Sequence, residues 1–196
     1  MFKPILAASV LALSLSACAT AVPSVEVTRF HVASPPTSGT VSVREMIGNP
    51  DVSLEFRTYA AAVAQEFQRV GFTEARDAQG EYEALVGMRR SFRPTGPDRS
   101  GRPVSVGVGG STGSYGSGLG LGIGINLSGK PKDVVTTELS VQLRRRADSQ
   151  VVWEGRANTS AKEGTPAAQP NIAAAKLAAA LIGGYPGESG RTITVK

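Results

Sequence analysis

The chain has few residues suited to catalysis or metal binding: it contains one cysteine, Cys18, and one histidine, His31, in 196 residues. A single cysteine excludes a disulfide within the chain. A zinc site would have to be built almost entirely from carboxylates. A serine–histidine–acid triad would have to use His31, but no G-x-S-x-G motif precedes an expected helix. We therefore expect no catalytic residue, no metal and no cofactor, and a structural or exposed His31.

Long hydrophobic runs are also missing. No segment after the N-terminus has about eighteen consecutive apolar residues, the length that crosses a bilayer as a helix. The uncharged run from Ile5 to Leu15 is shorter and follows a basic start, Met1-Phe2-Lys3-Pro4. A basic region followed by a short apolar run is typical of a secretion signal. We expect residues 1–17 to be this signal peptide.

The end of the apolar run, Leu15-Ser16-Ala17-Cys18, resembles the lipobox of bacterial lipoproteins. Cys18 would become the mature N-terminus and carry acyl chains such as palmitate, each buried methylene contributing about 0.8 kcal/mol to anchoring. The alternative is an ordinary signal peptide with a cysteine near its cleavage site. Ala19 stands where, by resemblance to the enterobacterial sorting rule, aspartate would favour the inner membrane. We expect a lipid-anchored outer-membrane protein that faces the periplasm.

The positive charge of the chain is modest. The chain has 21 lysines and arginines against 16 acidic residues. Removal of Lys3 with the signal leaves a net formal charge of +4. Basic proteins often bind nucleic acid, but an exported lipoprotein rarely meets it, so an envelope protein or an anionic lipid is the expected partner. The mature chain is long enough for one domain. We expect a tether over 18–24 and a single domain over 25–196.

Hydrophobic periodicity gives the expected elements of that domain. Spacing of three and four residues predicts a helix from an N-cap at Ser53 to a stop at Gly71, and an alanine-rich helix over 171–182. Alternation predicts strands over 25–32, 40–46, 82–92, 134–146, 151–155 and 191–196. This order favours an α+β fold, with an antiparallel or mixed sheet of about five to six strands, two helices packed on one face, and a glycine-rich hairpin or loop.

The glycine-rich segment is the only stretch that suggests a nucleotide site, and it fails the test. Residues 107–129 contain ten glycines, but no window has the G-x-G-x-x-G spacing of a dinucleotide site. The stretch from Gly124 to Lys130 matches a phosphate-binding loop until Pro131, which replaces the hydroxyl residue that binds magnesium. Strand-like alternation follows instead of a helix. We expect no nucleotide partner.

The same segment has a period of two. Aliphatic residues alternate with small ones at Leu119, Leu121, Ile123, Ile125 and Leu127. Valines do the same over 104–108, so the two runs could pair as a hairpin within an insertion over 104–129. One interpretation is that the aliphatic face packs on the protein's own core or that the segment is disordered. The other is contact with a membrane or partner, with Arg89, Arg90 and Arg93 just before it meeting anionic headgroups.

Two further features have structural interpretations. Arg144-Arg145-Arg146 ends an expected strand at a turn, where we expect solvated side chains. Trp153 lies in the next strand, and we expect it to anchor the core.

Several stretches of the chain resemble bacterial lipoproteins of the family named domain of unknown function 4136. They are 53–59 (SLEFRTY), 70–72 (VGF), 82–89, 151–157 (VVWEGRA) and 185–190 (YPGESG). The resemblance covers about residues 25 to 195 and implies the same fold and location. None of the stretches is a catalytic motif, and the family supplies no activity. Its members often have aromatic residues where this chain has leucine and isoleucine in the glycine-rich segment.

Together these observations predict a lipid-anchored envelope lipoprotein that acts as a non-enzymatic interaction or structural module. The alternative function is a membrane- or lipid-interacting factor that works through the hairpin 104–129. A third option, a hydrolase assembled from dispersed carboxylates, would require a concave site with converging acids.

Overall fold

The computed structural model describes residues 23–46, 53–75, 79–95, 104–111, 118–125 and 132–196. The signal expected over 1–17 and Cys18 lie outside these residues. Seven described strands form one sheet: β1 (Val25–His31), β2 (Gly39–Glu45), β3 (Phe72–Glu74), β4 (Tyr82–Arg93), β7 (Val134–Arg145), β8 (Val151–Lys162) and β9 (Thr192–Val195). Their order is β3-β2-β4-β7-β8-β1-β9. Strand β2 runs parallel to β3 and β4, and the other neighbours are antiparallel.

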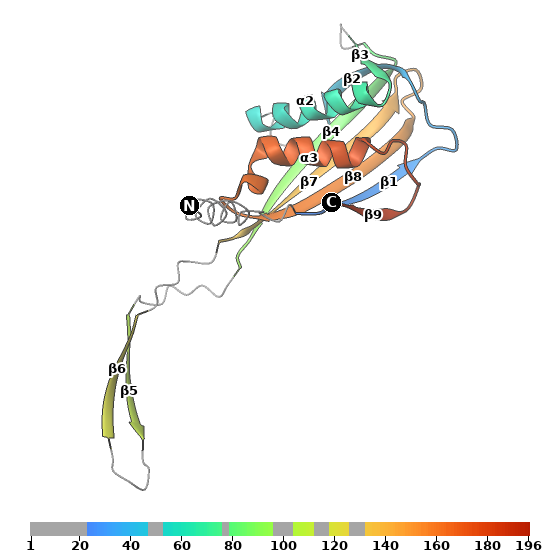
Figure 1. Cartoon of the computed structure of the whole chain (residues 1–196). Coiled ribbons are helices and arrows are strands. Elements are labelled where there is room, and N and C mark those ends of the chain that lie inside the picture. Colours follow the sequence, from blue (N-terminus) through green and yellow to red (C-terminus); the bar gives the residue numbers. More distant parts are fainter. Residues whose placement is uncertain (1–22, 47–52, 76–78, 96–103, 112–117, 126–131) are drawn as a thin grey trace, which may run out of the picture.

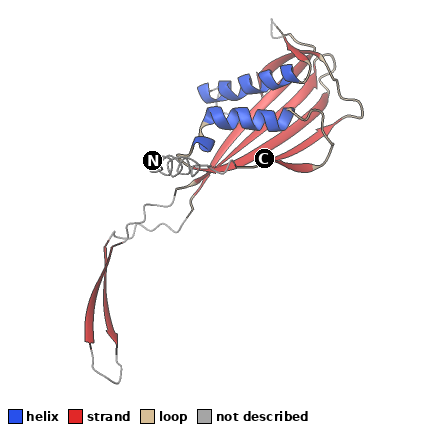
Figure 2. Ribbon diagram, viewed as in Figure 1, coloured by secondary structure: helices blue, strands red, loops and turns tan. Residues whose placement is uncertain are grey.

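Helices α2 (Leu54–Arg69) and α3 (Pro170–Ile182) lie side by side on one face of this sheet (Figure 1, Figure 2). The α+β class, the mixed sheet and the placement of the helices are therefore confirmed. The expected number of strands was too low, because the sheet has seven. Strand β3 has only three residues, too few to show a period. It forms because the chain turns at Gly71, whose φ of +107° suits glycine, and then pairs with β2.

The expected limits of both helices are nearly those observed. The Ser53 Oγ accepts a hydrogen bond from the Phe56 N–H at 3.1 Å and caps α2. Helix α2 buries one apolar stripe, which includes Tyr59, Val63 and Phe67. Helix α3 begins with a proline at its first position, where the missing N–H has no cost. Its alanines let it lie close to α2 and the sheet, which explains why it is buried on more than one side.

The core is centred on Trp153, which is fully buried as expected. The centroid of its indole ring lies 6.4 Å from that of the Phe67 ring, which it meets edge-on, and 5.4 Å from that of the Tyr185 ring. The Trp153 Nε1 donates a hydrogen bond to the carbonyl of Pro186 at 2.9 Å, so the polar end of the ring is also satisfied. Strand β8 continues seven residues beyond its expected end at Gly155. Gly155 lies under α3, where a Cβ would be 2.7 Å from the Leu181 Cδ1.

The glycine-rich segment contains two more strands, β5 (Val104–Ser111) and β6 (Gly118–Ile125), which form a separate antiparallel pair. The register pairs the three valines of β5 with aliphatic residues of β6, as in Val106↔Ile123, and most of the small residues with glycine, as in Gly107↔Gly122. The expected pairing of the two runs is therefore confirmed over the described residues. Leu127 lies outside them.

Candidate functional site

The N-terminal tether and the glycine-rich insertion both connect to the same end of the large sheet. Residues that pair across the sheet, from β4 to β9, form one row there: Arg90, Thr137, Thr159, Val25 and Val195. The N-terminal tether joins the sheet at Val25, and β4, the last strand before the glycine-rich insertion, ends three residues beyond Arg90, at Arg93. We call this end the tether end. Because adjacent strands are about 4.8 Å apart, β4 and β1 are separated there by roughly 14 Å.

The last residues of the tether are held against the domain. The Lys176 Nζ on α3 donates a hydrogen bond to the carbonyl of Pro23. The Thr159 Oγ1 on β8 donates to the carbonyl of Ser24 at 2.9 Å. Burial lowers the pKa of Lys176. Val25, the next residue, is fully buried. The path of the chain is therefore fixed at Pro23, five residues after Cys18.

The structure separates the three arginines expected to act together. Arg90 points toward the helices. Its Nη1 donates a hydrogen bond to the Glu55 Oε1 at 2.9 Å, and its Nη2 donates one to the Ala168 carbonyl at 3.0 Å. Ala168 ends the short 3₁₀ helix η2 (Pro166–Ala168). Arg90 thus ties β4 to the starts of both helices. Arg89 and Arg93 are exposed, and the alternation of strand side chains places them on the opposite face.

Tyr59 packs beside this contact and is fully buried. Burial is the main cause that raises its pKa to about 12, and the neighbouring Glu55 carboxylate raises it further. The phenol therefore stays neutral at physiological pH. This makes Tyr59 a packing residue of α2 rather than a general base.

The single histidine belongs to a junction that closes the domain at the other end of α3. The His31 Nδ1 lies 2.7 Å from the carbonyl of Val32, and its Nε2 lies 3.1 Å from the carbonyl of Gly187. Beside it, Arg29 is buried and donates through Nε to the Leu181 carbonyl and through Nη2 to the Ala180 carbonyl, both at 2.8 Å. A cation at a helix C-terminus is favourable. Both ring nitrogens of His31 thus face backbone carbonyls of the fold.

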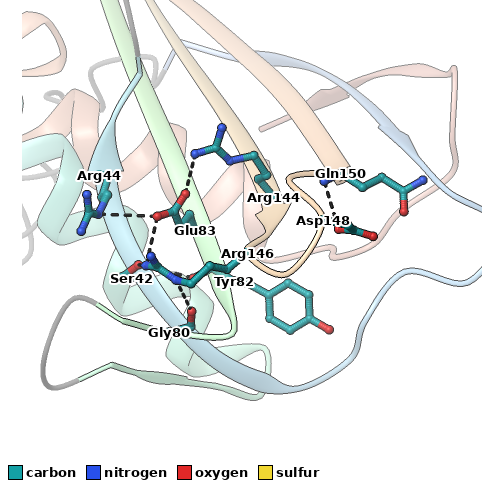
Figure 3. A network of polar contacts seen from close by, with 9 residues as sticks. All are labelled: Ser42, Arg44, Gly80, Tyr82, Glu83, Arg144, Arg146, Asp148 and Gln150. Atoms are coloured by element: carbon teal, nitrogen blue, oxygen red, sulfur yellow. Dashed lines mark hydrogen bonds and ion pairs between the residues drawn. The ribbon is translucent and has the colours of Figure 1, made fainter.

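A second polar cluster lies on the sheet face that the helices leave open (Figure 3). Glu83 accepts a hydrogen bond from the Arg144 Nη2 at 2.5 Å and lies 3.0 Å from the Arg146 Nη2 and 3.8 Å from the Arg44 Nε. The hydrogen bond from Arg144 is the main cause that lowers the pKa of Glu83. Arg146 is exposed, as expected, and Arg144 is half-buried, but both guanidinium groups are paired with Glu83. The register places Glu83 on β4 directly opposite Arg144 on β7. The sequence alone does not reveal this pairing.

The other predicted site residues are placed as follows. Four aliphatic residues of the glycine-rich run lie on β6, namely Leu119, Leu121, Ile123 and Ile125. Cys18 and Leu127 lie outside the described residues. In the described part of the chain, no three histidine, cysteine, aspartate or glutamate side chains are grouped as metal ligands would be. Over the same residues, no helix has the length and apolar character needed to span a membrane.

Comparisons with known proteins place the chain in a family. The family model described as "Domain of unknown function (DUF4136)" matches residues 28–187. The chain is 34% identical over 212 aligned residues to the uncharacterized protein ZMO1243 of Zymomonas mobilis, covering 88% of this chain and 80% of that protein.

Two solved structures are more distant. A PelC dodecamer from Paraburkholderia phytofirmans is 10% identical, with a TM-score of 0.45, over 80% of this chain and 93% of that one. A PDZ domain protein from Parabacteroides distasonis is 10% identical, with a TM-score of 0.46, over 88% of this chain and 39% of that one.

Proposed function

Because the chain belongs to the family described as domain of unknown function (DUF4136), which states no activity, we propose a function from the chain's own residues. The protein is a lipoprotein of the cell envelope, anchored in the outer membrane by acylated Cys18. Its domain lies in the periplasm and acts as a non-enzymatic interaction or structural module.

The observation that carries this proposal is the short distance between Cys18 and the first fixed residue. Pro23 is five residues after Cys18 and is held by Lys176. Five residues span at most about 18 Å when fully extended. Acyl chains on Cys18 would therefore hold the tether end of the domain close to the bilayer surface.

The polar groups of the described residues support a non-enzymatic role. Three polar clusters each join elements of the fold. Glu55 with Arg90 connects α2 to β4, and Glu83 joins β2, β4 and β7. His31 holds the segment after α3. Carboxylates and an imidazole that are already paired within the fold are poorly placed to bind substrate or transfer protons, and the buried polar atoms left without a partner beside them, Arg90 Nε and Arg144 Nε, are donors that carry no transferable proton at physiological pH.

Metabolic labelling with a clickable palmitate tests the proposal. The wild-type protein should carry the label, and Cys18→Ser should lose it without loss of the folded domain, because Cys18 precedes the first strand. Thr20→Ser, which changes the tether but keeps the cysteine, is the matched control and should stay labelled. A wild-type protein that remains unlabelled contradicts the proposal.

The alternative function, contact with lipid through the glycine-rich pair β5-β6, is favoured by one observation. The insertion leaves the sheet between Arg93 and Val134, which are paired at the tether end. The pair is therefore attached at the end of the sheet that the tether holds near the bilayer. Flotation of the Cys18→Ser chain with liposomes, with and without residues 104–129, tests it. Equal failure of both chains to float contradicts this alternative.

A further inference from the structure

Three exposed apolar side chains lie at the tether end. Over the described residues, the large apolar side chains that are exposed are Phe30, Leu54, Phe92, Val151 and Ile172. Leu54 is 78%, Phe92 58% and Ile172 41% exposed. We call these three the apolar rim. Large exposed apolar side chains that gather in one place mark contact with a partner or a membrane, whereas scattered ones need no explanation.

Each member of the apolar rim either contacts Arg90 or lies close in sequence to a residue that does. Leu54 precedes Glu55, which pairs with Arg90. The Phe92 ring lies against the Arg90 guanidinium, 5.8 Å from ring centroid to Cζ. Ile172 is in the first turn of α3, which begins just after Ala168, an acceptor for Arg90. Three different elements thus each carry an exposed apolar side chain near one of their ends, at the end of the domain where Arg90 joins β4 to both helices.

Exposed basic side chains lie at the same end of the sheet as the apolar rim, on the face that the helices leave open. Arg93 pairs with Val134 across β4 and β7, and Val134 pairs in turn with Lys162 on β8. Lys132 comes two residues before Val134. Arg93, Lys132 and Lys162 are all exposed, and Glu163 is the exposed acidic residue beside them. Exposed apolar side chains on one face and basic side chains on the other are typical of surfaces that lie in the interface of an anionic membrane.

We infer that the apolar rim inserts into the headgroup and upper acyl region of the same leaflet that holds acylated Cys18. The inference rests on the proposed lipidation, because the tether of five residues from Cys18 to Pro23 keeps this end of the domain within about 18 Å of the anchor. Interfacial side chains enter a bilayer by about 5–10 Å. The domain would thus be oriented on the membrane, with the open face of the sheet and the Arg29 junction left for other contacts.

Site-specific fluorescence quenching in the lipidated full chain tests the inference. Cys18 is the only cysteine and its sulfur is blocked by lipid, so Phe92→Cys, Leu54→Cys and Ile172→Cys each supply one free thiol for an environment-sensitive dye. Val151→Cys is the matched control, because Val151 is an exposed apolar residue at the far end of β8, opposite Arg144. The labelled proteins are reconstituted in phosphatidylethanolamine–phosphatidylglycerol vesicles that contain a lipid with a doxyl quencher high on its acyl chain.

We expect several-fold stronger quenching at the three rim positions than at Val151. Three results would overturn the inference. A lipidated chain in which rim and control dyes are quenched equally contradicts the inference alone. Rim dyes that are shielded from a water-soluble quencher but not reached by the lipid quencher indicate that a protein covers the rim instead. A chain whose mass shows no acyl group contradicts the proposed function, and the inference with it.

Discussion

Replacement of Gly187 by alanine should weaken the junction that closes the domain behind α3. Gly187 has a φ of +76°, where an L residue costs roughly 1–2 kcal/mol. A Cβ at this position would lie 2.7 Å from the Arg29 Cδ and 2.9 Å from its Nη1. The buried Arg29 side chain must therefore move, and its hydrogen bonds to the Leu181 and Ala180 carbonyls are at risk.

The expected loss of stability is the sum of the backbone cost at positive φ and the cost of the disturbed Arg29 hydrogen bonds. Each hydrogen bond from a charged group contributes about 1.5–3 kcal/mol. Loss of one of them, added to the backbone cost, predicts that Gly187→Ala lowers the free energy of unfolding by about 2.5–5 kcal/mol. Urea denaturation followed by the fluorescence of Trp153 measures this value, in a Cys18→Ser background that keeps acyl chains out of the assay.

Gly190→Ala is the matched control for this prediction. Gly190 lies in the same segment and has a φ of +81°, but a Cβ there would meet only the Phe30 Cε1, at 3.8 Å. It should cost only the backbone term, about 1–2 kcal/mol. Equal losses in the two variants would refute the argument, because the contact with Arg29 would then contribute nothing.

Three further predictions concern the rest of the fold. The pKa of Glu83 is lowered from its ordinary value near 4.5, so the stability that its carboxylate contributes is present above pH 4.5 and is lost as the pH falls through the lowered pKa. Between about pH 6 and about pH 3, the melting temperature should therefore fall more steeply in the wild type than in Glu83→Gln. Parallel curves for the two proteins would contradict this prediction. Gly155→Ala should lower the free energy of unfolding by about 1–3 kcal/mol through overpacking against Leu181, whereas Gly87→Ala, whose Cβ would meet the flexible Met46 side chain at 3.4 Å, should cost less in the same urea assay. Replacement of residues 104–129 by a short glycine-serine link should change the free energy of unfolding by less than about 1 kcal/mol, because β5 and β6 form a separate sheet; a larger loss in urea denaturation would show that the aliphatic face packs on the core.

Periodicity and capping residues predicted most of the elements, because these signals are local. The N-cap at Ser53, the stripe of α2 and the alternation of β7 each depend on neighbours a few residues away. The same reasoning failed where a strand is very short or where glycine interrupts it, as in β3 and at Gly155 in β8. In both places tertiary contacts, rather than local preference, decide the conformation.

The roles of the arginines were harder to predict, because they depend on register and on which helix covers which face. Arg90 and Arg93 look alike in the sequence, yet one contacts Glu55 and Ala168 and the other is exposed. The sequence also gives no sign that Leu54 and Ile172 belong to one surface. Each lies at the start of an otherwise ordinary helix, and only the fold brings them to the same end as Phe92.

The mass of the mature N-terminus tests the central claim most directly. Protein isolated from membranes, digested and measured by mass spectrometry should give an N-terminal peptide that begins at Cys18 and carries the mass of its acyl chains. An unmodified peptide that begins downstream of Cys18 would contradict the lipid anchor and the membrane-facing tether end that depends on it.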